Sequence, residues 1–140
     1  MPNDAPAHLD TDVLIRFLTG DDPDKQAAAA TLLQSVASGQ VMISAPDTVI
    51  ADAVYVLSSP RLYHLPRAQV EALLTPLVRL RGFRVQQKRL VLRALQLYGQ
   101  TNLDFGDTMI AAAVEQHGSG VLYSYDRGFD QLPSIRRVEP

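Results

Sequence analysis

The stretch VMISAPDTVIADAVYVL, residues 41–57, contains a strand pattern followed directly by a helix pattern. Its first four residues, VMIS, form a short apolar run beside turn-forming residues, which is typical of a buried strand. Asp47, or the Pro46 before it, then opens a helix that continues through Leu57 and stops at Ser58-Ser59-Pro60. A buried strand joined to a helix is the building unit of α/β proteins.

The rest of the chain repeats this alternation of short strands and helices. Glycine follows several helix patterns, as at Gly20, Gly39 and Gly118, and Pro76 should kink or break one helix. The other expected helices are residues 11–19, 23–38, 66–80, 88–98 and 104–117. The other expected strands are residues 7–10, 83–85, 121–125 and, at an edge, 136–139. Strands separated by helices predict an α/β fold with a mainly parallel sheet.

Length and composition indicate one ordinary globular domain. The chain has 140 residues, is 46% hydrophobic and contains no cysteine, which excludes disulfides, thiolate metal sites and cysteine nucleophiles. We expect a single domain over residues 1–140, with residues 1–6 as a disordered N-terminal tail. The apolar runs are too short for a membrane span, and the N-terminus lacks the pattern of a secretory signal. The sequence therefore predicts a cytoplasmic protein with no membrane partner.

The charge is small in total but divided along the chain. The net charge is −2, and 12 of the 15 acidic residues are aspartates. Residues 1–60 are acidic, whereas residues 61–93 carry seven Arg and one Lys against one Glu, a net charge of +7. The near-neutral total therefore hides acidic ends and a basic middle.

Aspartates stand at the ends of expected strands and at the starts of expected helices. Asp10 and Asp12 follow the first strand, Asp126 follows the fourth, and Asp104 and Asp107 share a face at a helix start. Ligands of parallel sheets bind at the carboxyl ends of the strands, so these positions suit a functional site. Each aspartate alone is explained just as well by a helix cap or an Asx turn.

Asp52 is different because it stands in the middle of an apolar helix. Val49 lies three residues before it, Val56 four residues after it, and alanines flank it. Burial of a lone carboxylate is costly unless the group is protonated, paired or bound to a metal. Two interpretations remain open: an exposed carboxylate on an otherwise apolar helix, or a carboxylate directed into a polar pocket.

One hypothesis unites four of these positions. Clustered carboxylates repel one another and stay ionised together only around cations, and all-oxygen ligands favour Mg²⁺, with Mn²⁺ as a substitute. No histidine stands where it would suggest zinc. The four carboxylates that could converge are Asp10, Asp52, Asp107 and Asp126.

Four segments in order resemble the signature blocks of PIN domains, especially VapC-type toxins of type II toxin–antitoxin systems. The segments are LDTDVLIRFLTGDDPD (9–24), TVIADAVYVLSS (48–59), NLDFGDTMIAAA (102–113) and VLYSYDRGFDQLP (121–133). Each block alone is weakly specific, but four in the right order at suitable spacing are fairly specific. The resemblance runs from about residue 8 to residue 139, nearly the whole chain.

The resemblance implies a three-layer α/β/α sandwich of the PIN type and a metal-dependent ribonuclease. The catalytic and metal-binding positions of the family fall on Asp10, Asp52, Asp107 and Asp126. Ser124 falls where the family often has Thr or Ser beside the site, Asp104 falls on a commonly acidic neighbour, and Asp12 adds charge to the pocket rim. Implied partners are an RNA substrate, a cognate VapB-type antitoxin whose C-terminal segment crosses the site, and a second copy in a homodimer.

The hypothesis that follows is an endoribonuclease in which the carboxylates hold one or two Mg²⁺ ions against a scissile RNA phosphate. The basic middle segment would guide phosphates towards this acidic pocket. Arg89 and Arg93 lie one turn apart on the helix at 88–98 and are the expected RNA-binding residues. An ordinary solvated helix face is an equally good interpretation of these two arginines.

Two further function classes compete with the ribonuclease. In the first, Asp10-Thr11-Asp12 serves as the nucleophile motif of a haloacid-dehalogenase-like phosphatase, with Asp10 attacking phosphorus. In the second, the chain keeps the fold and its partner interface but lacks turnover, because Asp stands at positions 12 and 52 where the family commonly has Asn and Glu. Trapping of an aspartyl-phosphate would identify the first, and weak Mn²⁺ binding the second.

Overall fold

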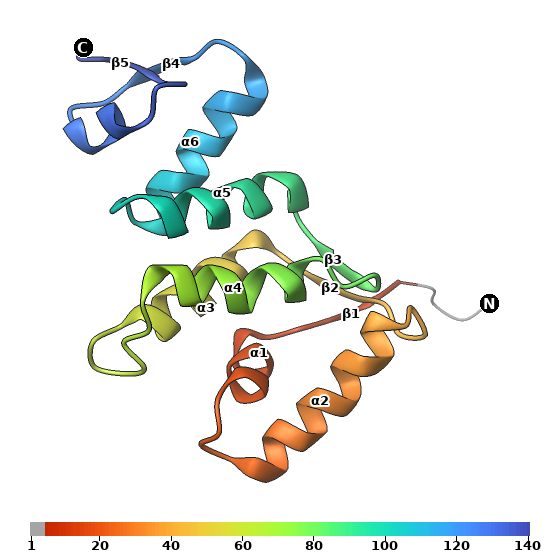
Figure 1. Cartoon of the computed structure of the whole chain (residues 1–140). Helices are drawn as coiled ribbons and strands as arrows, with labels where there is room; N and C mark the ends of the chain where they lie inside the picture. The colour runs from red at the N-terminus through yellow and green to blue at the C-terminus, as the bar shows by residue number, and fades with distance from the viewer. Residues whose placement is uncertain (1–4) are drawn as a thin grey trace.

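The computed structural model of the chain describes residues 5–140, and residues 1–4 of the expected N-terminal tail lie outside the described residues. The helices are α1 (Thr11–Leu18), α2 (Pro23–Ala37), α3 (Asp47–Ser58), α4 (Arg67–Val78), α5 (Lys88–Gln100) and α6 (Phe105–His117). The strands are β1 (Ala7–His8), β2 (Ile43–Ala45), β3 (Phe83–Val85), β4 (Val121–Tyr123) and β5 (Arg136–Val138), with a 3₁₀-helix η1 (Arg127–Gln131) before β5. The element order predicted from the sequence is confirmed (Figure 1).

The strand–helix unit expected at residues 41–57 is β2 followed by α3. β2 is the central strand of a parallel sheet in the order β1-β2-β3, and Ile43 pairs with Ala7 on one side and Phe83 on the other. Ile43 and Ala45 are both buried, which explains the apolar run, because a central parallel strand is covered on both faces. The unit therefore has the structure that its sequence pattern predicts.

The last two strands form a second parallel sheet. β4 pairs with β5, with Leu122 opposite Arg137. The expected α/β class with parallel strands is confirmed, while the strands divide between a three-stranded and a two-stranded sheet within the described part of the chain. Each sheet consequently keeps unpaired edge strands.

Helix ends follow ordinary capping chemistry. The side chains of Asp10, Asp22 and Asp104 accept hydrogen bonds from backbone N–H groups at the starts of α1, α2 and α6. Such caps satisfy donors that the first helical turn leaves free. Pro76 lies in the last turn of α4, which ends two residues later at Val78, so the proline does not divide that helix.

Two hydrophobic cores hold the molecule together. The larger core joins β1–β3 to α1–α5 and the first turns of α6. The smaller core joins α5 to the segment formed by α6, β4, η1 and β5, which we call the C-terminal unit. Its buried residues are Leu97, Leu103, Ala111, Phe129, Leu132 and Ile135.

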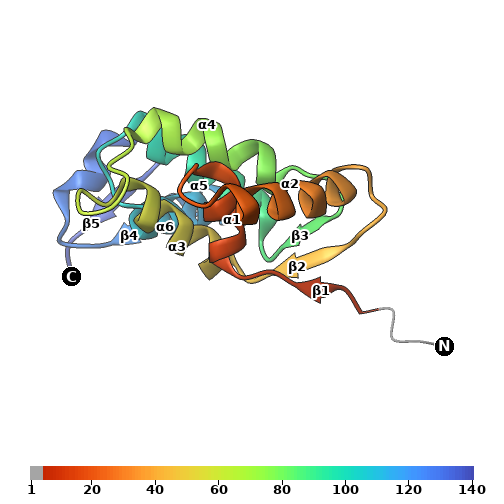
Figure 2. The same cartoon turned by 90° about the horizontal axis from the view of Figure 1, so that it is seen from below.

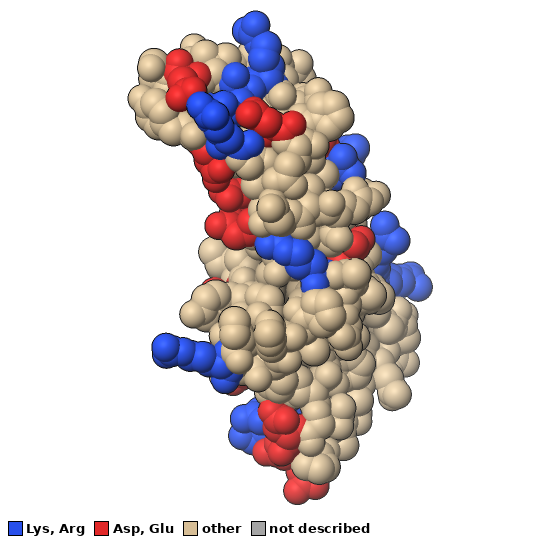
Figure 3. Space-filling model, turned by 60° about the vertical axis from the view of Figure 1, so that its left-hand side comes forward, with Lys and Arg blue, Asp and Glu red and all other residues tan. Residues whose placement is uncertain are grey.

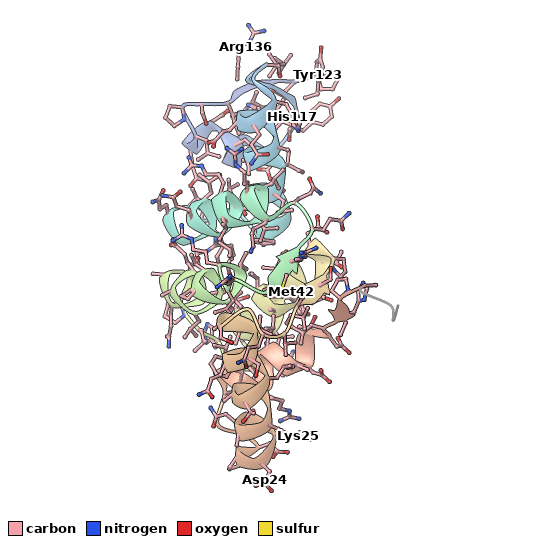
Figure 4. The ribbon with its side chains drawn as sticks, turned by 90° about the vertical axis from the view of Figure 1, so that its right-hand side faces the viewer. Asp24, Lys25, Met42, His117, Tyr123 and Arg136 are labelled. Atoms are coloured by element: carbon pink, nitrogen blue, oxygen red, sulfur yellow. The ribbon has the colours of Figure 1, made fainter. Side chains whose placement is uncertain are left out.

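The two sheets lie on opposite sides of helices α4 and α5, and the molecule is elongated (Figures 1 and 2). Figure 4 shows the same extension, with Tyr123 and Arg136 at one end, Met42 near the middle, and Asp24 and Lys25 at the other end. Among residues 5–140, none of the helices combines the length and the apolar character that a membrane crossing requires.

Candidate active site: two acidic groups

The first acidic cluster, the N-terminal acidic group, consists of Asp10, Asp12 and Asp52. Asp10 follows β1 directly and caps α1, where its carboxylate accepts a hydrogen bond of 2.6 Å from the Thr11 N–H. The Thr11 hydroxyl donates to the Val49 carbonyl at 3.4 Å, which connects α1 with α3. This contact holds the helix of Asp52 beside the carboxyl end of β1.

An open hollow of about 440 Å³ lies between α1 and α3. Its lining residues are Asp10, Thr11, Asp12, Ile15, Arg16, Asp52, Tyr55 and Val56. Asp10 and Asp52, which are far apart in sequence, therefore share one hollow, as expected for two members of a common site. Arg16 stands in the same wall and places a positive charge next to the carboxylates.

The burial suggested by the sequence around Asp52 is wrong. Asp52 is exposed, and Tyr55 on the next turn is 72% exposed. Ala53, Val54 and Leu57 provide the buried face of α3, so Asp52 projects from the opposite face into the hollow rather than into the core. The interpretation as a carboxylate lining a pocket stays in place, but no desolvation argument applies to it.

The second cluster, the C-terminal acidic group, consists of Asp104, Asp107 and Asp126. The Asp104 side chain caps α6 by accepting a hydrogen bond of 2.7 Å from the Asp107 N–H. Asp126 follows β4 and caps η1 by accepting a hydrogen bond of 2.8 Å from the Gly128 N–H. Ordinary capping chemistry thus places two acids next to Asp107, from two different elements.

Like charges distinguish Asp107 electrostatically. Partial burial raises the pKa of the Asp107 carboxyl, and the neighbouring charges of Asp104 and Asp126 raise it further. A raised pKa means that the negative charge is disfavoured in this environment. A bound cation would relieve that penalty, so the donor set fits a divalent cation with oxygen ligands.

Ser124 and Gly128 shape the turn that carries Asp126. The Ser124 hydroxyl accepts a hydrogen bond of 2.9 Å from the Asp126 N–H, so Ser124 positions the aspartate, as expected for a residue beside the site. A Cβ on Gly128 would come within 2.9 Å of Leu103 Cδ2 and 3.0 Å of Asp126 Oδ1. The glycine is therefore required by the close approach between this turn and the loop before α6.

The four predicted catalytic aspartates are brought together in pairs rather than all at once. Within residues 5–140, no group of three or more His, Asp or Glu side chains has a geometry that could hold a metal ion. Tyr55 lies between the two acidic groups, because it lines the hollow of Asp10 and Asp52 and also a second hollow of about 440 Å³ that contains Asp104. Figure 3 likewise shows acidic side chains in separate groups on one face, one at the height of the C-terminal unit and one at the opposite end.

The two predicted RNA-binding arginines have different environments. Arg89 is exposed on α5. Arg93 instead forms an ion pair with Glu115 of α6, with 2.7 Å between Arg93 Nε and Glu115 Oε2, and a second hydrogen bond to the same carboxylate. The side-chain hydrogen bond from Arg93 lowers the pKa of Glu115 despite its partial burial. Of this pair, Arg89 is the arginine with a free surface position.

Some residues of the site gave no signal in the sequence. Arg16 and Tyr55 belong to helix patterns in which any polar or aromatic residue could face solvent, and only the packing of α1 on α3 directs them to the hollow. Arg67 donates hydrogen bonds to the carbonyls of Tyr98, Asn102 and Leu103, which fixes the loop before Asp104. These contacts are non-local, so sequence spacing does not encode them.

Short parallel strands with aspartates at their carboxyl ends, surrounded by six helices in the described chain, define an α/β protein with an acidic site at the strand ends. The family model for the PIN domain matches residues 7–135, and the chain belongs to that family. The six helices and the parallel sheet β1–β3 are consistent with its three-layer α/β/α fold. PIN domains are generally metal-dependent nucleases, so this is a nuclease-type fold. Comparison with curated proteins gave no match.

Proposed function

We propose that this protein is a metal-dependent endoribonuclease that hydrolyses RNA phosphodiester bonds in the cytoplasm. The observation that carries the proposal is the acidic environment of Asp107, whose pKa is raised by burial and by the charges of Asp104 and Asp126. A site in which carboxylates disfavour their own charge is suited to a divalent cation. Membership of the PIN family supports the nuclease class.

The residues proposed to hold Mg²⁺, or Mn²⁺ in its place, are Asp10, Asp52, Asp107 and Asp126. When bound, the cation supplies a Lewis acid for the scissile phosphate and lowers the pKa of a water nucleophile. Ser124 positions Asp126 through its backbone N–H, and Asp104 positions Asp107 in the same way. Asp12 contributes negative charge at the rim of the first hollow, and Arg16 offers a positive charge to an RNA phosphate there.

The proposed biological role is that of a VapC-type toxin. In this role a cognate VapB-type antitoxin covers the acidic site, and the toxin acts as a homodimer. The exposed aromatic side chains Tyr55, Tyr123 and Tyr125 provide apolar contact area for such partners.

The test is cleavage of a fluorescent RNA by the purified protein in Mg²⁺, in Mn²⁺ and in excess chelator. We expect cleavage that depends on the cation and on the carboxylates, and no cleavage by the Asp107→Asn variant. Asp24→Asn is the matched control, because Asp24 is an exposed aspartate in the first turn of α2, at the opposite end of the molecule from Tyr123 (Figure 4). Equal cleavage by wild type and Asp107→Asn would disprove the proposal, and a phosphate ester trapped on Asp10 would instead identify a phosphatase.

A further inference from the structure

Two strand edges in this chain lack a neighbour. β1 lies at the edge of the first sheet and pairs only with β2, while β4 lies in a sheet in which its only neighbour is β5, in the part of the chain that the structure describes. Both sheets are parallel throughout. An unpaired edge exposes backbone donors and acceptors that another strand can satisfy.

The surface of β4 is also unusually apolar for an exposed strand. Tyr123 is 71% exposed and Tyr125 is 70% exposed, while Leu122 between them packs into the smaller core. Because side chains alternate along a strand, one face of β4 is covered by its own unit and the other face presents two tyrosines to solvent. In Figure 4, Tyr123 projects from the end of the molecule.

The C-terminal unit is fastened to α5, on the far side from β1. Glu115 of α6 accepts hydrogen bonds from Arg93 on α5 and from Ser134 before β5, at 2.9 Å for the Ser134 hydroxyl. Leu97 of α5 is part of the core of this unit. Only residues 118–120 connect α6 to β4, and three residues span at most about 11 Å. β4 therefore cannot cross α4 and α5 to reach β1 of its own chain while these contacts persist (Figure 1).

We propose that β4 of a second copy pairs in parallel with β1, and that the exchange is reciprocal. Each copy then supplies one β1 edge and one β4 edge, so a two-fold dimer satisfies both edges and closes on itself. The joined sheet would have the order β3-β2-β1-β4-β5, with the last two strands from the partner. The exposed tyrosines of β4 become covered in the same step.

This exchange makes the acidic site a shared one. Strands in parallel pairing have their carboxyl ends at the same sheet edge, so Asp10 after β1 meets Asp126 after the β4 of the second copy. The N-terminal acidic group of one chain is thereby completed by the C-terminal acidic group of the other. The chemistry of the completed site rests on the proposed function, whereas the strand pairing rests on the edges and the tyrosines alone.

The experiment uses cross-linking in the full chain, which has no cysteine of its own. One batch carries His8→Cys in β1, a second carries Tyr123→Cys in β4, and the two are mixed after joint refolding and treated with a short bismaleimide. We expect a covalent dimer from the mixture and little from either batch alone. A mixture of Asp24→Cys with Tyr123→Cys is the control and should remain uncross-linked, because Asp24 lies at the end of the molecule away from β1 and β4 (Figures 1 and 4).

Several results would overturn the proposal. One is a mixture that stays uncross-linked, and another is equal cross-linking in the Asp24→Cys control. A third is a double variant, His8→Cys with Tyr123→Cys, that cross-links within a single chain, which would show closure of the chain on itself. Light scattering on the unmodified protein supports the exchange if it gives two chains and contradicts it if it gives one. None of these measurements uses RNA or a metal, so failure of the ribonuclease proposal would leave them interpretable.

Discussion

The two acidic groups differ in how the fold supports them. The N-terminal group lines an open hollow, its Asp52 is exposed, and Arg16 stands beside it. The C-terminal group is held by two caps, and its Asp107 is disfavoured as an anion by burial and by two acidic neighbours. One group thus has space for a substrate, whereas the other has the charge that needs a cation. The difference teaches that neither group alone has all the parts of a nuclease site, and that the account requires both.

The largest expected effect comes from removing one carboxylate from each group. We expect Asp10→Asn and Asp107→Asn each to slow RNA cleavage by at least about 100-fold, because each would remove a metal ligand. Single-turnover rates with a labelled RNA measure the effect. Comparable losses from the two groups would indicate one shared site; a large loss from Asp107→Asn with normal cleavage by Asp10→Asn would separate the groups.

The next effect concerns the packing that supports only the C-terminal group. Gly128→Ala should destabilise the fold by about 1–3 kcal/mol, because the added Cβ would meet Leu103 Cδ2 at 2.9 Å. Urea denaturation gives the free energy of unfolding. Gly20→Ala is the control, since a Cβ there meets nothing within 4 Å and its φ is not positive. Equal stability of the two variants would show that the turn before Phe129 is not tightly packed.

A smaller effect follows from the ion pair that fastens the C-terminal unit to α5. The hydrogen bond from Arg93 lowers the pKa of Glu115 below its ordinary value of 4.5. A lowered pKa contributes stability that is present above pH 4.5 and is lost as the pH falls through the folded value. Wild type should therefore lose more stability on acidification than Glu115→Gln does, by about 1 kcal/mol or less, because the pair is partly exposed.

A double-mutant cycle with Arg93→Ala isolates that contribution. The coupling between positions 93 and 115, measured by denaturation at pH 7 and at pH 3, should be present at pH 7 and largely absent at pH 3. A coupling that is the same at both pH values would mean that Ser134 and packing, rather than the charge pair, hold the unit.

The smallest effect concerns the basic segment between the two groups. Arg89→Glu should weaken RNA binding and reduce the slope of log affinity against log salt by about 1, as expected for one phosphate contact. Binding is measured by fluorescence anisotropy at several salt concentrations. An unchanged slope would assign Arg89 to an ordinary solvated helix face and leave the acidic groups without a basic approach surface on α5.

Local patterns were sufficient to predict most of the fold. The apolar run at 41–44, the caps at Asp10 and Asp22, and the glycine after α6 each depend on residues close in sequence, and the corresponding elements form where expected. The division of the strands between two sheets was not predictable in this way. It depends on how α5 and α6 pack, and that packing uses the long-range pair of Arg93 and Glu115.

The site was predictable in its residue types but not in its assembly. Caps and turns place Asp10, Asp104 and Asp126 at element ends, which the sequence indicated. The exposure of Asp52 was not indicated, because its helix is apolar on both sides of it in sequence and only tertiary packing selects the buried face. Arg16 and Tyr55 were missed for the same reason.

The most direct test of the central claim, that the two groups form one site across two copies, is complementation between inactive variants. Asp10→Asn and Asp107→Asn chains are refolded separately and together, and RNA cleavage is measured against wild type. Reciprocal exchange predicts recovery to about one quarter of the wild-type rate in the mixture, because half of the dimers are mixed and each mixed dimer has one intact site of two. A mixture as inactive as either variant alone, beside an active wild type, would contradict the account.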